Sequence, residues 1–313
     1  MIRNSIDDIR FDPNSIVTVG TFDGMHIAHC RIIDALKEKA SATGSRSVVI
    51  TFKPHPQEII GRKNVQLLMT EEDRVQAISD AGIDEVVLLK FDRDFSLVTA
   101  EGFLVNMIHR KVGLRELVLG YNHTFGHRAE GTVEFAREVG KRVGFGVDYI
   151  EAVVVEGEKV SSSAIRKNLL AGKLSLANDM LGRPYAVEGF VIQGNQRGRL
   201  LGYPTANLKL VDSRLLVPAF GVYIVEVTVE GNRMPGLASL GIRPTFEDDG
   251  APMVEVWISD FDRDIYGRQI KVTFMKRLRD EMKFDSVQEL IAQMDRDKRE
   301  MNEFLVKTIN KQR

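Results

Sequence analysis

Two histidines, His26 and His29, lie where a short apolar run gives way to an amphipathic segment. The run 16–19 is β-branched and ends in Gly20, and the apolar residues beyond the histidines recur with helical spacing. A helix N-terminus offers free N–H groups and positive potential to an anion, and residues three apart share one helical face. Imidazoles at that place add hydrogen-bond donors, so the pattern predicts a phosphate-handling site.

Further polar residues follow other predicted strands. Two prolines flank His55 in the segment 51–56, a run with two histidines spans 120–128, and serines with Arg166 open a helix at 161. Taken singly, each has a plainer explanation: a surface histidine pair, an N-cap serine, or prolines that shape a turn. In a parallel sheet, ligands bind outside the carboxyl ends of the strands. The placement of all these residues at such ends therefore favours a nucleotide pocket.

These positions depend on an alternation of strands and helices over residues 15–172. The predicted strands are 16–19, 48–52, 86–91, 117–119 and 149–155, and the predicted helices are 27–42, 70–81, 100–111, 130–143 and 161–171. The alternation indicates a Rossmann-like α/β domain with a parallel sheet and helices on both faces. The sequence contains neither a P-loop nor G-x-G-x-x-G, which disfavours a Walker-type ATPase and a dinucleotide-dependent dehydrogenase. A His-x-x-His pair alone is also a poor zinc signature.

The pattern changes near residue 172, and a linker at 182–185 leads into short strands with turns between them. The predicted strands are 186–192, 222–229, 254–258 and 270–274, with a hairpin turn at 230–232. They indicate a small antiparallel β-barrel. A long helix follows over 286–311, with a capping box of Ser286 and Glu289 and an apolar stripe that we expect to pack on the barrel. We therefore expect domains at 1–182 and 183–313.

A glycine-rich basic run in this second half, 194–207, has the composition of a phosphate-binding loop. It combines glycines, two arginines, a proline-stiffened turn, and a hydroxyl two residues from an amide. Most such loops taken alone are solvated turns. The evidence that this one binds phosphate therefore comes mainly from the Pro-Thr-Ala-Asn tetrad that ends at Asn207. Periodicity alone makes Glu255 an outward strand residue between the inward Val254 and Val256.

The composition fits a soluble protein of the cytoplasm. The chain has 313 residues, a net charge of −1 and one cysteine, Cys30, so it forms no intrachain disulfide. A near-neutral balance disfavours nucleic-acid and anionic-membrane partners. The first fifteen residues are polar, unlike a signal peptide, and no apolar run is long enough to span a bilayer. The sequence leaves self-association open.

The segment 20–29 resembles the G-x-F-D-G-x-H-x-G-H signature of the HxGH nucleotidyltransferases, and 51–56 and 160–166 resemble the T-F-x-P-H-P and I-S-S-T-x-I-R motifs of their flavin branch, the FAD synthetases. Ala28 stands where the signature has glycine, Asn122 where the branch usually has aspartate, and Ser163 and Ala164 where it has threonine and arginine. These departures bear on the adenylylation rate more than on the fold. The resemblance implies catalytic roles for His26 and His29 in holding the phosphates of ATP. It also implies nucleotide or flavin contacts by Gly20, Phe22, Asp23, Ser162, Arg166, Asn122 and Pro56.

The tetrad 204–207 resembles the P-T-A-N motif of riboflavin kinases, and 240–246, 254–261 and 264–267 agree with that family. The resemblance implies that Thr205 and Asn207 are ligands of Mg²⁺ and phosphate, and that Glu255 is the general base for the ribityl 5′-hydroxyl. It further implies that Gly194, Gly198 and Arg199 contact ATP.

Over nearly its full length the chain is similar to the bacterial bifunctional riboflavin kinase/FAD synthetases. That family phosphorylates riboflavin to FMN in the C-terminal domain and adenylylates FMN to FAD in the N-terminal one, with ATP and Mg²⁺. Two alternatives are a working kinase with a weakened adenylyltransferase, and a flavin- or nucleotide-binding regulator without catalysis. The retained histidines and Glu255 argue against the regulator, because a pure binder needs no positioned base. A nucleic-acid-binding module is opposed by the charge balance.

Overall fold

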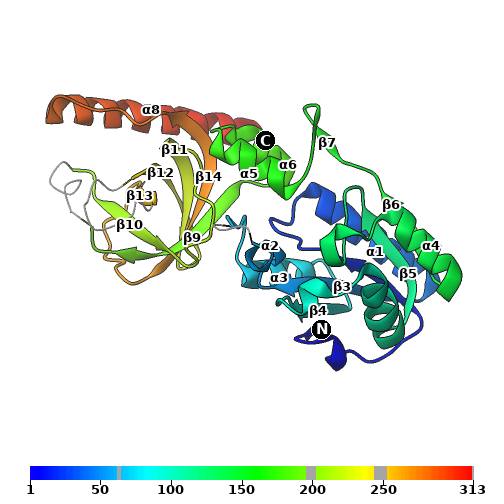
Figure 1. The fold of residues 1–313 in the computed structure, drawn as a ribbon. Coiled ribbons are helices and arrows are strands. Elements are labelled where there is room, and N and C mark those ends of the chain that lie inside the picture. Colours follow the sequence, from blue (N-terminus) through cyan, green and yellow to red (C-terminus); the bar gives the residue numbers. More distant parts are fainter. Residues whose placement is uncertain (62–64, 195–201, 243–251, 312–313) are drawn as a thin grey trace. The chain divides into compact units, whose positions relative to one another are not determined.

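The computed structural model describes residues 1–61, 65–194, 202–242 and 252–311. The chain divides into two compact units, Met1–Ala164 and Ile165–Arg313 (Figure 1). The division lies ahead of the domain boundary expected between residues 182 and 183, because α6 (Leu174–Leu181) packs on strands of the second unit. The expected assignment of activities to 1–182 and 183–313 remains a prediction.

The first unit is built on a six-stranded sheet with the order β1-β4-β3-β2-β5-β6, and all its pairs are parallel. Its strands are β1 (Ile2–Arg3), β2 (Ser15–Val19), β3 (Arg46–Lys53), β4 (Glu85–Lys90), β5 (Leu114–Gly120) and β6 (Gly146–Ile150). The order places β2 between β3 and β5, so the loops that follow these three strands meet at one edge. The predicted α/β fold class is confirmed.

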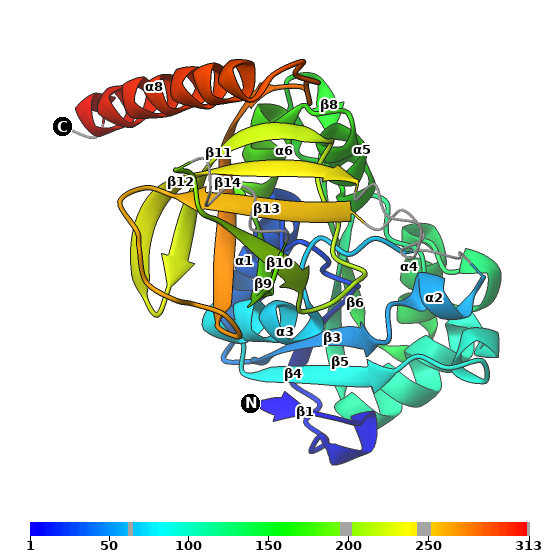
Figure 2. The same cartoon turned by 90° about the vertical axis from the view of Figure 1, so that its left-hand side faces the viewer.

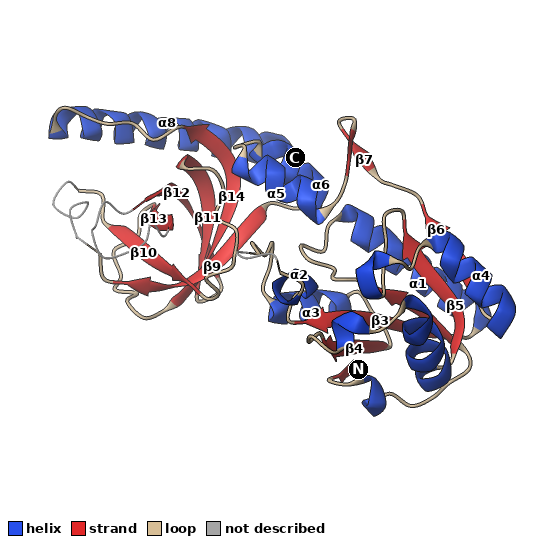
Figure 3. Cartoon of the chain, in the orientation of Figure 1, coloured by secondary structure: helices blue, strands red, loops and turns tan. Residues whose placement is uncertain are grey.

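Helices cover both faces of this sheet, as predicted (Figure 3). On one face, strand residues pack against α1 (Ile27–Thr43) and α3 (Glu71–Asp80). On the other, they pack against a π-helical segment, Gly102–Val112, and α4 (Val133–Val143). The caps explain the limits of α1, which begins after His26 and ends at Gly44, whose φ of 58° is costly for residues with a side chain.

Two details of the first unit differ from the predictions. The fifth predicted strand was expected over 149–155, but β6 ends at Ile150, and the chain then forms a small hairpin of β7 (Val154–Val155) and β8 (Glu158–Lys159). The turn between β7 and β8 uses Glu156 and Gly157 with φ of 48° and 80°. The predicted strand 149–155 is therefore divided between the end of β6 and β7. The sequence pattern also missed β1 and the short helix α2 (Pro56–Ile59).

The second unit is a closed antiparallel barrel with the order β10-β13-β12-β11-β14-β9 (Figure 2). Its strands are β9 (Tyr185–Ile192), β10 (Thr205–Leu210), β11 (Gly221–Val229), β12 (Asn232–Ile242), β13 (Pro252–Ile258) and β14 (Gln269–Arg279). The predicted barrel is confirmed, and so is the hairpin, since Val229 pairs directly with Asn232. Strands β10 and β12 were not predicted. Closure leaves no strand of the barrel unpaired at an edge.

Helices complete this unit. The chain enters it through α5 (Ser162–Leu170) and α6, and it ends in α8 (Val287–Lys311). Helix α8 packs on the barrel as expected, with Met301 fully buried in a cluster with Ile224, Leu237 and Trp257. The buried Asp297 anchors the helix by accepting hydrogen bonds from the Arg279 guanidinium of β14, the shortest at 2.7 Å.

Candidate functional sites

The first turn of α1 holds His26 and His29 against each other. His26 is the N-cap, because its Nδ1 accepts a hydrogen bond of 3.3 Å from the backbone N–H of His29. The rings stack with centroids 3.5 Å apart and an interplanar angle of 13°. Since Nδ1 accepts, a neutral His26 ring carries its proton on Nε2, where it can donate. The structure thus brings the two predicted catalytic histidines together at a helix N-terminus.

Electrostatics keep His29 neutral. Burial, and then the charge that a protonated His26 or His123 would add, hold the pKa of His29 well below its ordinary value. A neutral imidazole still donates one hydrogen bond, and it does not have to be buried as a cation. The cluster can therefore contact an anion without repulsion between its own rings.

Phe22 and Gly20 shape the loop beneath these histidines. Phe22 has a φ of 50°, a rare conformation for a bulky residue, and its side chain is 1% exposed. Its ring centroid lies 5.1 Å from that of His29. A Cβ added at Gly20 would come within 3.1 Å of the Phe22 ring, so glycine makes room for it. In the structure Phe22 supports the ring of His29, and Gly20 leaves room for Phe22. The contact of both residues with the nucleotide remains a prediction.

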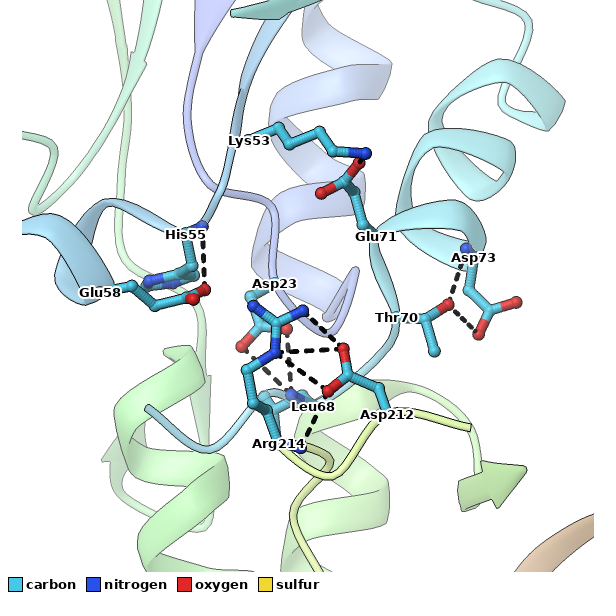
Figure 4. A network of polar contacts seen from close by, with 10 residues as sticks. All are labelled: Asp23, Lys53, His55, Glu58, Leu68, Thr70, Glu71, Asp73, Asp212 and Arg214. Atoms are coloured by element: carbon cyan, nitrogen blue, oxygen red, sulfur yellow. Dashed lines mark hydrogen bonds and ion pairs between the residues drawn. The ribbon is translucent and has the colours of Figure 1, made fainter. Parts of the chain in front are cut away.

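Asp23 is buried and uses its carboxylate within the protein. Both carboxylate oxygens accept hydrogen bonds from the backbone N–H of Leu68, at 3.0 and 3.2 Å (Figure 4). The hydroxyl of Ser162 donates to the backbone oxygen of Asp23 at 2.8 Å. Asp23 therefore joins three segments that are distant in the sequence: the loop after β2, the segment before α3, and the start of α5. Its nearness to Ser162 agrees with the predicted site.

The segment after β3 forms a capped turn. His55 caps α2 by accepting from the N–H of Gln57 at 3.3 Å, and the Glu58 carboxylate accepts the N–H of His55 at 3.1 Å (Figure 4). Pro56 occupies the first helical position, where a missing N–H costs nothing. From the next helix, the buried Arg74 donates to the backbone oxygen of Phe52 at 2.7 Å. Pro56 thus fixes the start of α2, and its predicted flavin contact remains untested.

The loop after β5 contributes His123, one of the two histidines in the run 120–128. Its Nε2 atom is buried and has no hydrogen-bond partner among the described residues, and the same holds for Nδ1 of His29. Burial lowers the pKa of His123 to about 4. Asn122, predicted to bind flavin, is exposed beside it. The sequence places His123 in this loop but assigns it no role of its own, because no motif relates it to His26 and His29.

Arg166 lies four residues after Ser162 in α5, so the two share one face of that helix, as the predicted phosphate-binding pair requires. Arg166 is half-buried. Gly198 and Arg199, predicted to contact ATP, lie outside the described residues.

A second cluster gathers on the barrel. Asn207 of β10 pairs directly with Glu255 of β13, which pairs on its other side with Ser239 of β12. Thr205 lies two residues before Asn207, on the same face of β10. A Cβ added at Gly194 would come within 2.0 Å of the Asn207 amide nitrogen, so glycine is required there. The structure thus brings together four of the residues predicted for this site, namely Thr205, Asn207, Glu255 and Gly194.

One neighbour of this cluster on β13 packs with α8. Val254 and Val256 are buried in the barrel, whereas Trp257, two residues from Glu255, packs with α8. Tyr203 stacks edge-on against Trp257 with centroids 5.6 Å apart, and its hydroxyl donates to Asp295 of α8. Burial and this bond raise the pKa of Tyr203 to about 12. The segment that leads into β10 is therefore tied to α8 by Tyr203.

The described residues show neither a cluster of three or more His, Cys, Asp and Glu side chains suited to a metal ion nor a helix long and apolar enough to cross a membrane. The side-chain oxygens of the barrel cluster do not form a metal site of that kind. They include one carboxylate, one amide and one hydroxyl, the set that suits a hard cation shared with a phosphate.

Comparison with known proteins assigns each unit to a family. Residues 8–164 match the FAD synthetase family, and residues 181–305 match the riboflavin kinase family. The bifunctional riboflavin kinase/FMN adenylyltransferase of Listeria monocytogenes is 35% identical over 95% of this chain and 94% of its own. Its Bacillus subtilis counterpart is 36% identical over 91% of each chain.

A solved structure has the same overall fold. It comes from Streptococcus pneumoniae, is described as a macrolide-efflux protein, and is 32% identical to this chain. The match covers 96% of this chain and 98% of that one, with a TM-score of 0.86. Both domain families and the full-length relatives agree with the two clusters described above, and the chain belongs to the family of bifunctional riboflavin kinase/FMN adenylyltransferases.

Proposed function

We propose that the barrel cluster phosphorylates riboflavin to FMN and that the α1 cluster transfers an adenylyl group from a second ATP to FMN, which gives FAD and pyrophosphate. The observation that carries the proposal is the direct pairing of Asn207 with Glu255 in a chain that also stacks His26 on His29 at a helix N-terminus. One cluster supplies a base and oxygen donors, and the other supplies imidazole donors without a nucleophile.

In the kinase step, Glu255 takes the proton from the ribityl 5′-hydroxyl as that oxygen attacks the γ-phosphorus of ATP. A carboxylate suits this task because it accepts the proton while the oxygen becomes nucleophilic. We expect Thr205 and Asn207 to hold Mg²⁺ together with phosphate oxygens, and the ion would neutralise charge on the transferred group. Gly194 leaves room for Asn207, and Gly198 and Arg199 complete the proposed ATP contacts.

In the adenylyl step, a phosphate oxygen of FMN attacks the α-phosphorus of ATP, and pyrophosphate leaves. Because the acceptor is itself the nucleophile, catalysis consists of positioning and charge neutralisation. His26, His29 and the free N–H groups of α1 contact the phosphates, with Ser162 and Arg166 from α5. Phe22 and Asp23 hold this loop in place, and Asn122 and Pro56 face the flavin.

We assign these activities to residues 1–182 and 183–313 and expect the enzyme to work in the cytoplasm on riboflavin, FMN and ATP, without a nucleic-acid partner. The near-neutral charge supports the absence of a nucleic-acid partner, and the single exposed cysteine supports a reducing compartment.

The test is to incubate the full chain with riboflavin and Mg·ATP and to chromatograph the flavins over time, with a parallel reaction started from FMN. We expect FMN to appear first and FAD to follow. FMN that accumulates from riboflavin but stays unchanged when supplied as the substrate would leave only the kinase. Unchanged riboflavin together with unchanged FMN would overturn both activities.

A further inference from the structure

We infer that His123 is a third imidazole of the phosphate site beside His26 and His29, and that its Nε2–H donates a hydrogen bond to a phosphate oxygen of ATP. The inference deepens the proposed adenylyl transfer and rests on it.

The first argument is where the backbone places His123. Strands β2 and β5 are neighbours, with Thr18 paired to Val118, so the loops that follow them start at the same edge of the sheet. The chain turns directly after β5, because the N–H of His123 donates to the backbone oxygen of Gly120 at 3.1 Å. A Cβ added at Gly120 would come within 2.8 Å of Cδ1 of Ile32, which lies in α1. The turn that carries His123 is therefore packed closely against the helix that carries His29.

The second argument is the state of the ring nitrogens. Nε2 of His123 and Nδ1 of His29 are buried without a hydrogen-bond partner within the described ranges. Other histidines differ, since Nδ1 of His127 lies 3.1 Å from the backbone oxygen of Ser96, and Nδ1 of His55 accepts a backbone N–H. Buried polar atoms in folded proteins are normally hydrogen-bonded, and leaving one unpaired is costly. The two unpaired atoms therefore indicate a ligand that supplies their partners.

The third argument is the chemistry of that ligand. An imidazole that stays neutral offers one N–H donor, and the low pKa values of His29 and His123 keep both rings neutral near pH 7. Oxygens of a polyphosphate accept several such bonds at once, and hydrogen bonds to charged groups are stronger than neutral ones. The N-terminus of α1 favours the same anion. A polyphosphate thus satisfies the donors of both loops.

A packing role for His123 is the competing explanation, because its ring lies 5.9 Å from that of Phe125 in a stacked arrangement. His123→Phe separates the two, since it keeps an aromatic ring and removes the donor. We expect it to raise the KM for ATP in FMN adenylylation, and the KM for pyrophosphate in the reverse reaction, by about ten- to a hundredfold. The maximal rate at saturating ATP should change less. Riboflavin phosphorylation, measured on the same preparation, should be unchanged.

The matched control is His109→Phe. His109 also lies beside an aromatic ring, that of Phe145 at 5.9 Å, but its Nδ1 is near the backbone oxygen of Leu114 at the opposite end of β5. It should leave both KM values unchanged. His123→Gln retains an N–H donor and should lose less affinity than His123→Phe, which also covers the case in which the phenylalanine variant fails to fold.

The outcomes are distinguishable. If the wild-type chain makes no FAD from FMN, the proposed function fails. If it does, and the KM values for ATP and pyrophosphate in both His123 variants equal those of the wild type, the role of His123 is overturned while the function stands. A fall in kcat with unchanged KM would assign His123 to packing.

Discussion

Asn207 and Glu255 occupy directly opposite positions on β10 and β13. Directly opposite residues of an antiparallel pair have Cβ atoms about 5 Å apart, so an amide and a carboxylate can contact one substrate from two strands. Because Glu255 lies opposite Asn207, this outward strand residue becomes a candidate for the general base.

Replacing Glu255 by glutamine should abolish riboflavin phosphorylation and leave FMN adenylylation intact. The amide keeps the size of the side chain but cannot accept the proton, and loss of a general base costs roughly a hundred- to ten-thousandfold in rate. Flavin chromatography with riboflavin and with FMN as separate substrates measures both steps. Glu226→Gln, at a half-exposed glutamate of β11, is the matched control. Normal kinase turnover in Glu255→Gln would remove Glu255 from the base role.

His26 has two functions that a pair of variants can separate. His26→Ala removes both the imidazole and the cap, so it should reduce FAD formation and lower the free energy of unfolding by about 1 kcal/mol. His26→Asn restores a good N-cap and should reduce only FAD formation. Urea unfolding and the FMN-to-FAD assay measure the two effects. Equal activity of His26→Asn and the wild type would reduce His26 to a structural cap.

Gly194→Ala should impair the kinase by displacing Asn207. The added Cβ would lie 2.0 Å from the amide nitrogen of Asn207, so one of the two must move. We expect weaker riboflavin phosphorylation with normal FAD formation from FMN. Gly146→Ala is the control, since the new Cβ there meets only the flexible side chain of Glu116 at 3.2 Å. A kinase rate in Gly194→Ala that matches the control would show that the loop adapts without cost to the site.

The stability of the first unit should fall as the pH is lowered from about 6.5 towards about 4. Native His29 and His123 have lowered pKa values, about 4 for His123, whereas the unfolded chain takes up protons below the ordinary value of 6.5. The unfolded state therefore binds more protons in this window, and each group contributes a slope of up to about 1.4 kcal/mol per pH unit. Urea unfolding by circular dichroism at several pH values measures the slope. It should be shallower in His123→Phe, and an unchanged slope would contradict the assignment.

Asp297→Ala should destabilise the second unit by about 3 kcal/mol or more, because it leaves the Arg279 guanidinium without its buried partner. Trp257 is the single tryptophan of the chain and packs with α8, so its fluorescence reports this unit. Arg233→Ala, which breaks an exposed ion pair of 3.7 Å with Glu226, should change the free energy of unfolding by less than about 0.5 kcal/mol. A small effect of Asp297→Ala would mean that the ion pair with Arg279 contributes little to holding α8 on the barrel.

The sequence predicts the elements whose periodicity is strong, and it fails where tertiary contacts decide. The strands and helices that carry His26 and Glu255 follow from local patterns. Strand β12 does not, because Pro235 and Gly236 argue against a strand; a Cβ at Gly236 would come within 2.5 Å of the Trp257 backbone oxygen, so the glycine serves the close approach of β13. Strand β10 was hidden inside a run that looked like a loop, and only its pairing with β9 and β13 reveals it.

The site residues also fall into those that local sequence predicts and those that only tertiary contacts bring together. His26 and His29 are close in the sequence, so their spacing predicts a contact that the structure confirms. The contact of Asp23 with Leu68 and the place of His123 beside α1 depend on strand order and loop packing, which no local pattern encodes. The carboxylate of Asp23 binds a backbone amide of the protein itself, and the expected place of Asp23 near the nucleotide remains a prediction.

The alternation along β13 also bears on how this enzyme can change over time. Val254 and Val256 fill the barrel, while Glu255 points to the opposite face beside Asn207. Neighbouring residues of β13 thus have separate roles: Val254 and Val256 stabilise the fold, and Glu255 is the proposed base. Substitutions at position 255 leave the packing of Val254 and Val256 in the barrel untouched, so this position can change with little loss of stability.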